Sequence, residues 1–236
     1  MTPFYLTIDD GPSEDTETKW QLFEDHKISA IWFCLGKNLE KYPEVAMELI
    51  KKGHIIGNHS YNHPFFSQIN FDECRDQIIK TEKIIDDIYS KAGVKRLAKF
   101  FRFPYGDQGH LEDWKISNNP EKTKHREKLQ QLLKELGFQP GPFSKVEYRG
   151  LYINQPEDVD WLWSYDIREW DIGDKNDSHL SFEEVESNLR KYLPNYDRNK
   201  EQIILMHDHE QTAQYFPQLI TILMEAQINL TIPKFN

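Results

Sequence analysis

The chain has 236 residues, of which 38% are hydrophobic and 29% charged, so it is long enough to form one sizeable core. Its formal net charge of −10 argues against nucleic acid or an anionic membrane surface as a partner, because binding phosphates needs a basic face. No apolar run is long enough for a transmembrane helix, and no secretory signal is visible. These features favour a cytoplasmic protein, and a secreted mature form is the alternative.

Strand-like and helix-like segments alternate along the chain. Apolar, β-prone runs predict strands over 4–9, 28–35, 54–58, 100–103, 160–165, 202–206 and 228–232. Amphipathic periodicity and capping signals predict helices over 13–26, 42–52, 71–91, 121–136, 181–193 and 211–226. This alternation is typical of a largely parallel α/β sheet with helical cover, and the number of units favours a barrel over a small open sheet.

No linker, repeat or low-complexity tract divides the chain, so we expect a single domain over residues 1–236. The one irregular stretch is 138–159, which is rich in proline, glycine and aromatic residues and is expected to be a loop insertion. Its side chains Tyr148, Arg149 and Tyr152 are candidates for one wall of a substrate groove.

Two adjacent carboxylates, Asp9 and Asp10, follow the first predicted strand and precede a Gly-Pro turn. Successive side chains of a strand point to opposite faces, so the two acids can occupy different environments. One can bind a metal while its neighbour serves as a base. An isolated Asp-Asp-Gly is more often a solvated turn, so this interpretation depends on partners elsewhere in the chain.

A pair of histidines, His59 and His63, follows the strand predicted over 54–58. Residues four apart lie on one face of a helical turn, and that spacing suits two ligands of one metal. Ser60 stands where the helical metalloprotease motif has a glutamate, so that motif is excluded. Two surface histidines are the simpler explanation unless a carboxylate from another strand end joins them.

Further polar and aromatic residues follow the later predicted strands. Each has an ordinary structural explanation when it is taken alone. Because the carboxyl ends of parallel strands converge on one face of a barrel, we expect them to meet. Arg102 is a candidate to hold a carboxylate in a bidentate ion pair, and Tyr105 to bind an oxyanion with its backbone N–H. Asp166 is a candidate orienting carboxylate, Trp170 a packing wall and His207 a general acid.

Five motifs now stand in one order: TIDDG (7–11), HSYNH (59–63), RFPYG (102–106), DIREW (166–170) and LMH (205–207). In these motifs the chain resembles the polysaccharide deacetylases with the NodB-homology domain, carbohydrate esterase family four, from residue 7 to about residue 232. The resemblance implies a distorted (β/α)7-type barrel. It also implies a metal-dependent hydrolase in which metal-bound water attacks the amide carbonyl of an N-acetylated amino sugar.

The same resemblance implies one divalent metal, usually Zn2+ and otherwise Co2+, Ni2+ or another ion, with Asp10, His59 and His63 as ligands. It implies that Asp9 is the general base, held by Arg102. It implies that His207 is the general acid and that Asp166 tunes it. It implies that Tyr105 is the oxyanion-hole donor, and that Tyr105 and Trp170 contribute to the substrate groove.

Three positions depart from the family pattern: Ile8 replaces a phenylalanine, Glu169 stands where an aspartate is frequent, and His209 is unusual and is expected at the surface. Two alternatives stay open. The same fold can hydrolyse another C–N bond, such as a formamide, ureide or cyclic imide. A non-catalytic glycan-binding homologue is the other, although inactive relatives tend to lose a ligand, base or acid and none is lost here. The sugar, its polymer length and the oligomeric state are left open.

Overall fold

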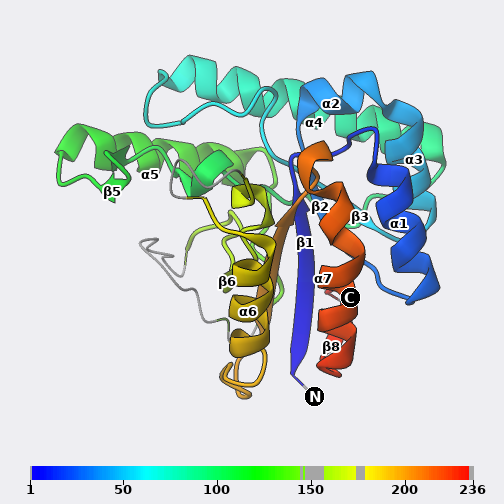
Figure 1. Ribbon diagram of the computed structural model, residues 1–236. Coiled ribbons are helices and arrows are strands. Elements are labelled where there is room, and N and C mark those ends of the chain that lie inside the picture. The colour runs from blue at the N-terminus through cyan, green and yellow to red at the C-terminus, as the bar shows by residue number, and fades with distance from the viewer. Residues whose placement is uncertain (1, 144–145, 147–156, 174–178, 234–236) are drawn as a thin grey trace.

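A parallel sheet forms the centre of the protein, and its strands end at one edge, the upper one in Figure 1. The structure is a computed structural model and describes residues 2–143, 146, 157–173 and 179–233. The hydrogen-bonded path through the sheet is β3-β2-β1-β7-β6, and β8 pairs with the start of β1. The strands are β1 (Pro3–Asp9), β2 (Ile31–Cys34), β3 (Ile55–Asn58), β6 (Tyr165–Asp166), β7 (Gln202–His207) and β8 (Asn229–Thr231).

The central strand β1 is buried from Phe4 to Asp9, as expected for an apolar run covered on both faces of a parallel sheet. Its last residue is in register with Phe33 of β2 on one side and with His207 of β7 on the other. The two carboxylates therefore leave the sheet at its middle, where side chains from both neighbouring strands can reach them.

Helices cover the sheet and cross its carboxyl edge (Figure 1). The longest, α4, begins at a capping box between Asn70 and Glu73 and ends at Gly93, whose φ of 69° suits a left-handed cap. Within the described part of the chain, no helix is both long and apolar enough to cross a membrane. The helices are α1 (Thr16–Asp25), α2 (Gly36–Lys41), α3 (Pro43–Lys51), α4 (Phe71–Ala92), α5 (Pro120–Glu135), α6 (Phe182–Tyr192) and α7 (Phe216–Glu225).

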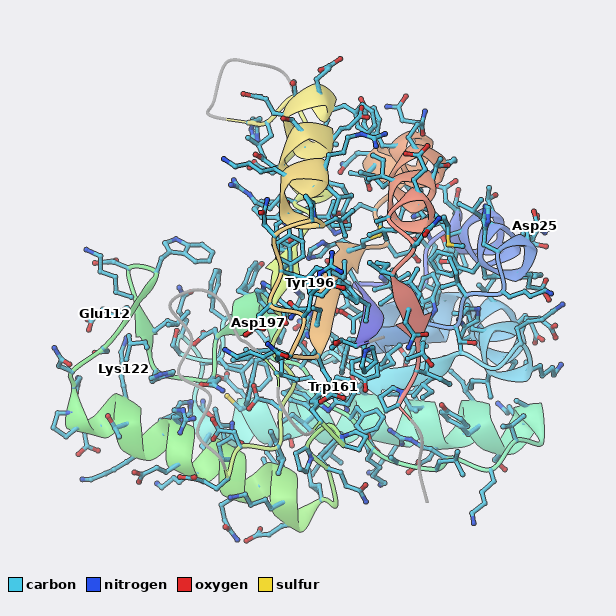
Figure 2. The ribbon with its side chains drawn as sticks, turned by 90° about the horizontal axis from the view of Figure 1, so that it is seen from below. Asp25, Glu112, Lys122, Trp161, Tyr196 and Asp197 are labelled. Atoms are coloured by element: carbon cyan, nitrogen blue, oxygen red, sulfur yellow. The ribbon has the colours of Figure 1, made fainter. Side chains whose placement is uncertain are left out.

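A second apolar cluster, which includes Ile31 and Phe33 of β2, packs against the sheet, and Figure 2 views the molecule from below. Trp161, near the middle of that view, is fully buried, and its ring centroid lies 4.5 Å from that of Phe100. The label of Glu112 marks a short hairpin of β4 (Leu111–Glu112) and β5 (Lys115–Ile116) at the periphery. The sequence patterns did not predict this hairpin.

The predicted α/β class with a parallel sheet and a distorted barrel is confirmed, and the helices predicted over 42–52, 71–91 and 121–136 agree with α3, α4 and α5 to within a residue or so at each end. Three segments differ. The strand predicted over 100–103 is a single bridge between Asn58 and Phe101, because Pro104 has no N–H to extend the ladder and Tyr105 turns the chain with a φ of 59°. Only Tyr165 of the segment 160–165 joins a strand, and residues 210–215 form a 3-10 helix before α7. Most of the predicted insertion 138–159, with Tyr148, Arg149 and Tyr152, lies outside the described residues.

Candidate active site

A cavity of about 560 Å³ opens at the carboxyl ends of β1, β3 and β7. Arg102 lies behind it, fully buried, and contacts one of its lining carboxylates. The structure therefore brings the predicted site residues that it describes to one place. Those that line the cavity are Asp9, Asp10, His59, His63, Tyr105, Asp166, Trp170 and His207.

One carboxylate oxygen of Asp10 faces both motif histidines. Its Oδ1 lies 3.2 Å from Nε2 of His63 and 3.6 Å from Nε2 of His59. Among the described residues this buried oxygen has no hydrogen-bond partner. The Nδ1 of His59 lies 2.8 Å from the carbonyl oxygen of Arg102, and this contact turns Nε2 toward Asp10.

The ionisation of these three groups suits a divalent metal. Burial lowers the pKa of both His59 and His63 to about 4, so both rings are neutral at pH 7 and have a lone pair to offer. Burial opposes ionisation of Asp10, but the hydrogen bond from His209, together with the other nearby histidines, holds the pKa of its carboxyl well below its usual range. Two neutral imidazoles and one carboxylate with an unpartnered oxygen fit a catalytic metal that keeps a coordination position open.

The local backbone differs from the predicted helical turn at His59 and His63. Residues 59–63 form an irregular turn in which Ser60 and His63 have φ values of 67° and 66°. Asn58 holds this turn, because its Oδ1 accepts the N–H of Ser60 at 2.9 Å. The two rings converge, with centroids 5.0 Å apart, through left-handed backbone conformations and not through helical spacing.

Asp9 is held by the buried guanidinium of Arg102. Nη1 of Arg102 donates to Oδ1 of Asp9 at 2.7 Å and to Oγ1 of Thr7 at 2.9 Å, while its Nε and Nη2 donate to the carbonyls of Trp161 and Leu162. Burial raises the pKa of Asp9, against the lowering effect of Arg102. The other oxygen, Oδ2, lies 3.5 Å from Nε2 of His59 and is on the side of the two motif histidines.

The direct hydrogen-bond partner of His207 is Glu169, whereas the family resemblance implied Asp166 as the carboxylate that tunes His207. Nδ1 of His207 lies 3.1 Å from Oε1 of Glu169, and the backbone N–H of His207 donates to the same oxygen. Asp166 instead accepts the N–H of Arg168 at 2.8 Å and Nε1 of Trp170 at 3.1 Å. The two acids lie three residues apart in the sequence, and only the fold decides which one hydrogen-bonds the imidazole.

The charge state of His207 follows from these acids. Burial alone would lower the pKa of its imidazole, but the hydrogen bond with Glu169 and the charges of Glu169 and Asp166 raise it to about 10. Ligand atoms of Asp166, Glu169 and His207 lie within 4.8 Å of one another and form a second possible metal group. A protonated imidazole has no lone pair for a metal, so the group of Asp10 fits better.

His209 was expected at the surface and instead lies in the cavity. Its Nε2 is 2.8 Å from Oδ2 of Asp10, and its side chain is about one-third exposed. The preceding residue, Asp208, is buried and bonded to Lys19 and Ser13, and these bonds hold the backbone of this segment beside the cavity. The ion pair partner of Asp208 comes from α1, so the sequence near His209 carries no signal for this placement.

Aromatic rings form a rim on one side of the cavity. The ring of Tyr105 stacks on Phe65 with centroids 3.9 Å apart and meets the edge of His63 at 4.3 Å. Trp114, at the tip of the β4–β5 hairpin, packs edge-on against Phe65 at 5.2 Å and is 61% exposed. No sequence pattern pointed to Trp114, because the hairpin has non-glycine residues with positive φ at its tip and so lacks the usual glycine signal.

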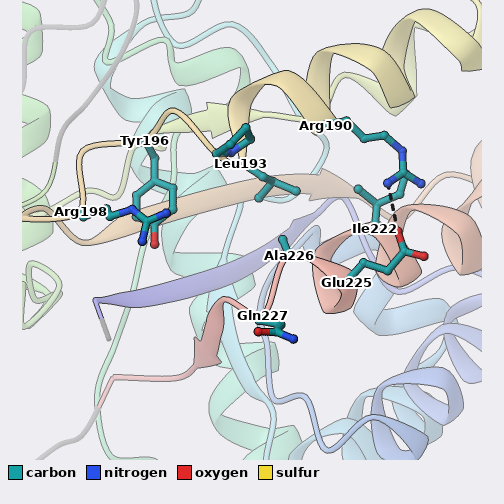
Figure 3. A pocket seen from close by; sticks show the side chains of 9 residues that line it. Arg190, Leu193, Tyr196, Arg198, Ile222, Glu225, Ala226 and Gln227 are labelled. Carbon is teal, nitrogen blue, oxygen red and sulfur yellow. Dashed lines mark hydrogen bonds and ion pairs between the residues drawn. The ribbon is translucent and has the colours of Figure 1, made fainter.

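A second cavity, of about 530 Å³, lies between α6 and α7 (Figure 3). There Arg190 pairs with Glu225 of α7 at 3.0 Å, which compensates its charge. The described lining contains neither a histidine nor a cysteine that could ligate a metal or serve as a base. The chemistry is therefore concentrated in the cavity at the carboxyl ends of the strands.

Comparison with known proteins agrees with this geometry. The family model described as polysaccharide deacetylase matches residues 2–139. The chain is 43% identical over 103 residues to a peptidoglycan-N-acetylglucosamine deacetylase of Bacillus cereus, a match that covers 43% of this chain and 36% of that protein. It is 31% identical over 107 residues to a chitooligosaccharide deacetylase of Azorhizobium caulinodans, covering 45% and 49%. These matches thus span between a third and a half of the relatives' length.

The fold is also shared with solved structures. A polysaccharide deacetylase of Bacillus cereus superposes with a TM-score of 0.66 at 22% identity, over 99% of this chain and 93% of that one. A family 4 carbohydrate esterase of Streptomyces lividans, solved with acetate, gives a TM-score of 0.61 at 20% identity over 99% and 98%. At these identities the likeness shows the fold alone.

Proposed function

Because this chain belongs to the polysaccharide deacetylase family, we propose that it is a metal-dependent hydrolase that removes N-acetyl groups from an N-acetylated sugar or glycan. One observation carries the proposal. The buried, unpartnered Oδ1 of Asp10 faces Nε2 of both His59 and His63, while the residue before it, Asp9, is held by Arg102 at the same strand end. Ligands and base therefore adjoin one another.

A divalent metal held by Asp10, His59 and His63 would supply Lewis acidity, which polarises the amide carbonyl and lowers the pKa of water. Asp9 is the general base that takes a proton from the attacking water. Burial raises the pKa of Asp9 and so makes it a stronger base, and the bond from Arg102 leaves Oδ2 on the side of His59.

His207 is the general acid. It stands on β7 in register with Asp9 on β1, so acid and base enter the cavity from neighbouring strands. With a pKa raised to about 10, its imidazole carries a proton at neutral pH and can give it to the departing amine as the C–N bond breaks. The products are then acetate and the free amino sugar.

Tyr105 is proposed to stabilise the developing oxyanion with its backbone N–H. Its φ of 59° turns the chain between Pro104 and Gly106, and the residue lines the cavity beside His63. Preorganised backbone donors are an effective way to stabilise such charge.

The walls of the cavity suit a sugar. Trp170 and Trp114 line it with exposed indole rings, and the phenol ring of Tyr105 contacts both Trp114 and His63. Aromatic faces pack well against the apolar faces of sugar rings, while the carboxylates favour a neutral or amino sugar over an anionic one. An acetylated amino sugar, as oligomer or polymer, is the proposed substrate class.

The test is metal analysis followed by a release screen. Chain loaded with Zn2+, Co2+ or Ni2+ is incubated with N-acetylated glucosamine oligomers, peptidoglycan glycan and formylated amines, and acetate and formate are measured. We expect acetate release that an Asp9→Asn variant loses while it keeps its metal. Formate release alone would indicate another C–N substrate. Binding of the oligomers without any turnover would indicate a glycan-binding protein, and either result would overturn the proposal.

A further inference from the structure

The two oxygens of the Asp10 carboxylate have different partners. Oδ1 faces His59 and His63 and is otherwise unpartnered among the described residues, while Oδ2 lies 2.8 Å from Nε2 of His209. A carboxylate oxygen accepts hydrogen bonds and an imidazole N–H donates them, so Nε2 of His209 is the donor in this contact. His209 thus donates to the oxygen that points away from the two motif histidines.

The backbone of Asp10 is fixed independently of this bond. Its N–H donates to the carbonyl of Phe33 at 3.1 Å, and its carbonyl accepts Nδ2 of Asn38 at 2.7 Å. A φ of 72° directs the residue out of the line of β1. With the main chain held, the torsions of a short side chain are the remaining freedom, and a bond to one oxygen decides where the other points.

The backbone of His209 is fixed as well. Its carbonyl accepts the N–H of Thr212 at 3.2 Å and Oγ1 of Thr212 at 3.1 Å, and Nζ of Lys19 lies at 3.4 Å. Its neighbour Asp208 is buried and bound to Lys19 and Ser13. The imidazole therefore reaches Asp10 from a rigid segment, as a preorganised donor does.

We propose that His209 is a positioning residue of the metal site, holding Oδ2 of Asp10 so that Oδ1 is offered together with His59 and His63. The inference rests on the metal dependence of the proposed function. Groups that hydrogen-bond a ligating carboxylate orient it, and their loss typically costs tenfold to a hundredfold in metal affinity. A direct ligand role for His209 is the rival explanation, because imidazole is also a zinc ligand.

The experiment measures metal affinity and does not depend on turnover. Metal-free wild type, His209→Ala and His209→Gln are titrated with Co2+ and Zn2+ against a chelating indicator. We expect His209→Ala to bind about tenfold to a hundredfold more weakly. We expect His209→Gln, whose amide N–H reaches about as far as Nε2–H, to bind close to wild type and to give the visible absorption of wild-type Co2+ protein.

Two control variants give the metal affinities expected without any effect and after loss of a ligand. His26→Ala, at an exposed histidine after α1, should bind as wild type does, and His63→Ala sets the loss expected for a ligand. Unchanged affinity in a folded His209→Ala, or a Co2+ spectrum of His209→Gln altered as in His63→Ala, would overturn the positioning role. A wild-type chain that holds no divalent metal would overturn the proposed function as well, which separates the two failures.

Discussion

One carboxylate oxygen of Glu169 contacts His207 at two atoms: Oε1 accepts the backbone N–H of His207 and also lies 3.1 Å from its Nδ1. The first bond fixes the end of β7, and the second fixes the imidazole that extends from it. Glu169 is fully buried, so its charge acts on the ring with little screening by water. One side chain therefore sets both the position and the proton affinity of the proposed acid.

Glu169→Gln should move the alkaline limb of activity to lower pH. The pKa of His207 is raised to about 10, so the acid is protonated below that pH and loses its proton as the pH rises through it. Gln keeps the shape of the side chain but removes its charge, which should shift the alkaline limb of the kcat/KM profile to lower pH by about one to three units. The pH profile with saturating metal measures this. An unmoved limb would show that Glu169 does not set the proton affinity of the acid.

Trp114→Ala should lower kcat/KM more for long oligomers than for short ones. The indole stands 61% exposed at the rim, and its edge packs on Phe65, which stacks in turn on Tyr105. Loss of one stacked ring should lower kcat/KM by roughly fivefold to tenfold, on the basis of about 1 kcal/mol for such a contact. The loss should grow with the length of the N-acetylated oligomer. Trp114→Phe should retain most of the preference, and an equal loss at every length would contradict the role.

The sequence was sufficient to predict the strand ends and the residues they carry. Asp9, Asp10 and His207 follow apolar runs directly, and the carboxyl ends of parallel strands must meet at one edge. This reasoning needs only local patterns and a topological rule, and it located the candidate ligands, base and acid.

The sequence was insufficient where a partner is chosen by the tertiary fold. Asp10 and His209 are 199 residues apart, and His209 reaches the site because Asp208 is buried against Lys19 of α1. Glu169 was passed over in favour of Asp166 because a 3-10 turn over Glu169–Asp171 decides which acid faces β7. Neither arrangement leaves a periodic signal.

The free energy of unfolding of His54→Asn should fall less than that of wild type when the pH is lowered from 7 to 4. His54 is buried, its Nδ1 accepts the N–H of Ala30 at 3.0 Å, and burial lowers its pKa from 6.5 to about 4. The unfolded chain thus binds the proton first, so stability is present above pH 6.5 and is lost as the pH falls toward 4. The loss amounts to about 3 kcal/mol. Asn keeps an acceptor for Ala30 without a titrating ring.

Urea unfolding between pH 7 and pH 4 checks this, with a chelator present so that the histidines of the metal site behave alike in both proteins. The free energy of unfolding of His54→Asn should fall less steeply with acid than that of wild type. His26→Ala, at an exposed position, should follow wild type. Parallel curves for His54→Asn and wild type would remove His54 from the acid response.

Lys19→Met should destabilise the fold strongly, because it leaves a buried carboxylate without its cation. Nζ of Lys19 bonds Oδ1 of Asp208, and both side chains are at most 1% exposed. Ser13 donates to the same carboxylate through its N–H at 3.0 Å and its Oγ at 2.8 Å, so the charge stays in place when the lysine is lost. Breaking a buried pair in this way costs about 3–5 kcal/mol.

A matched surface pair separates burial from pairing. Lys51 and Glu48 lie 2.7 Å apart with both side chains almost half exposed, so Lys51→Met should cost less than about 1 kcal/mol. Adding Asp208→Asn to Lys19→Met removes the stranded charge and should recover part of the loss, which a double-mutant cycle in urea measures. If Lys19→Met costs no more than Lys51→Met, the ion pair does not hold the segment that carries His209, and the hydrogen bonds of Ser13 and Thr212 hold it instead.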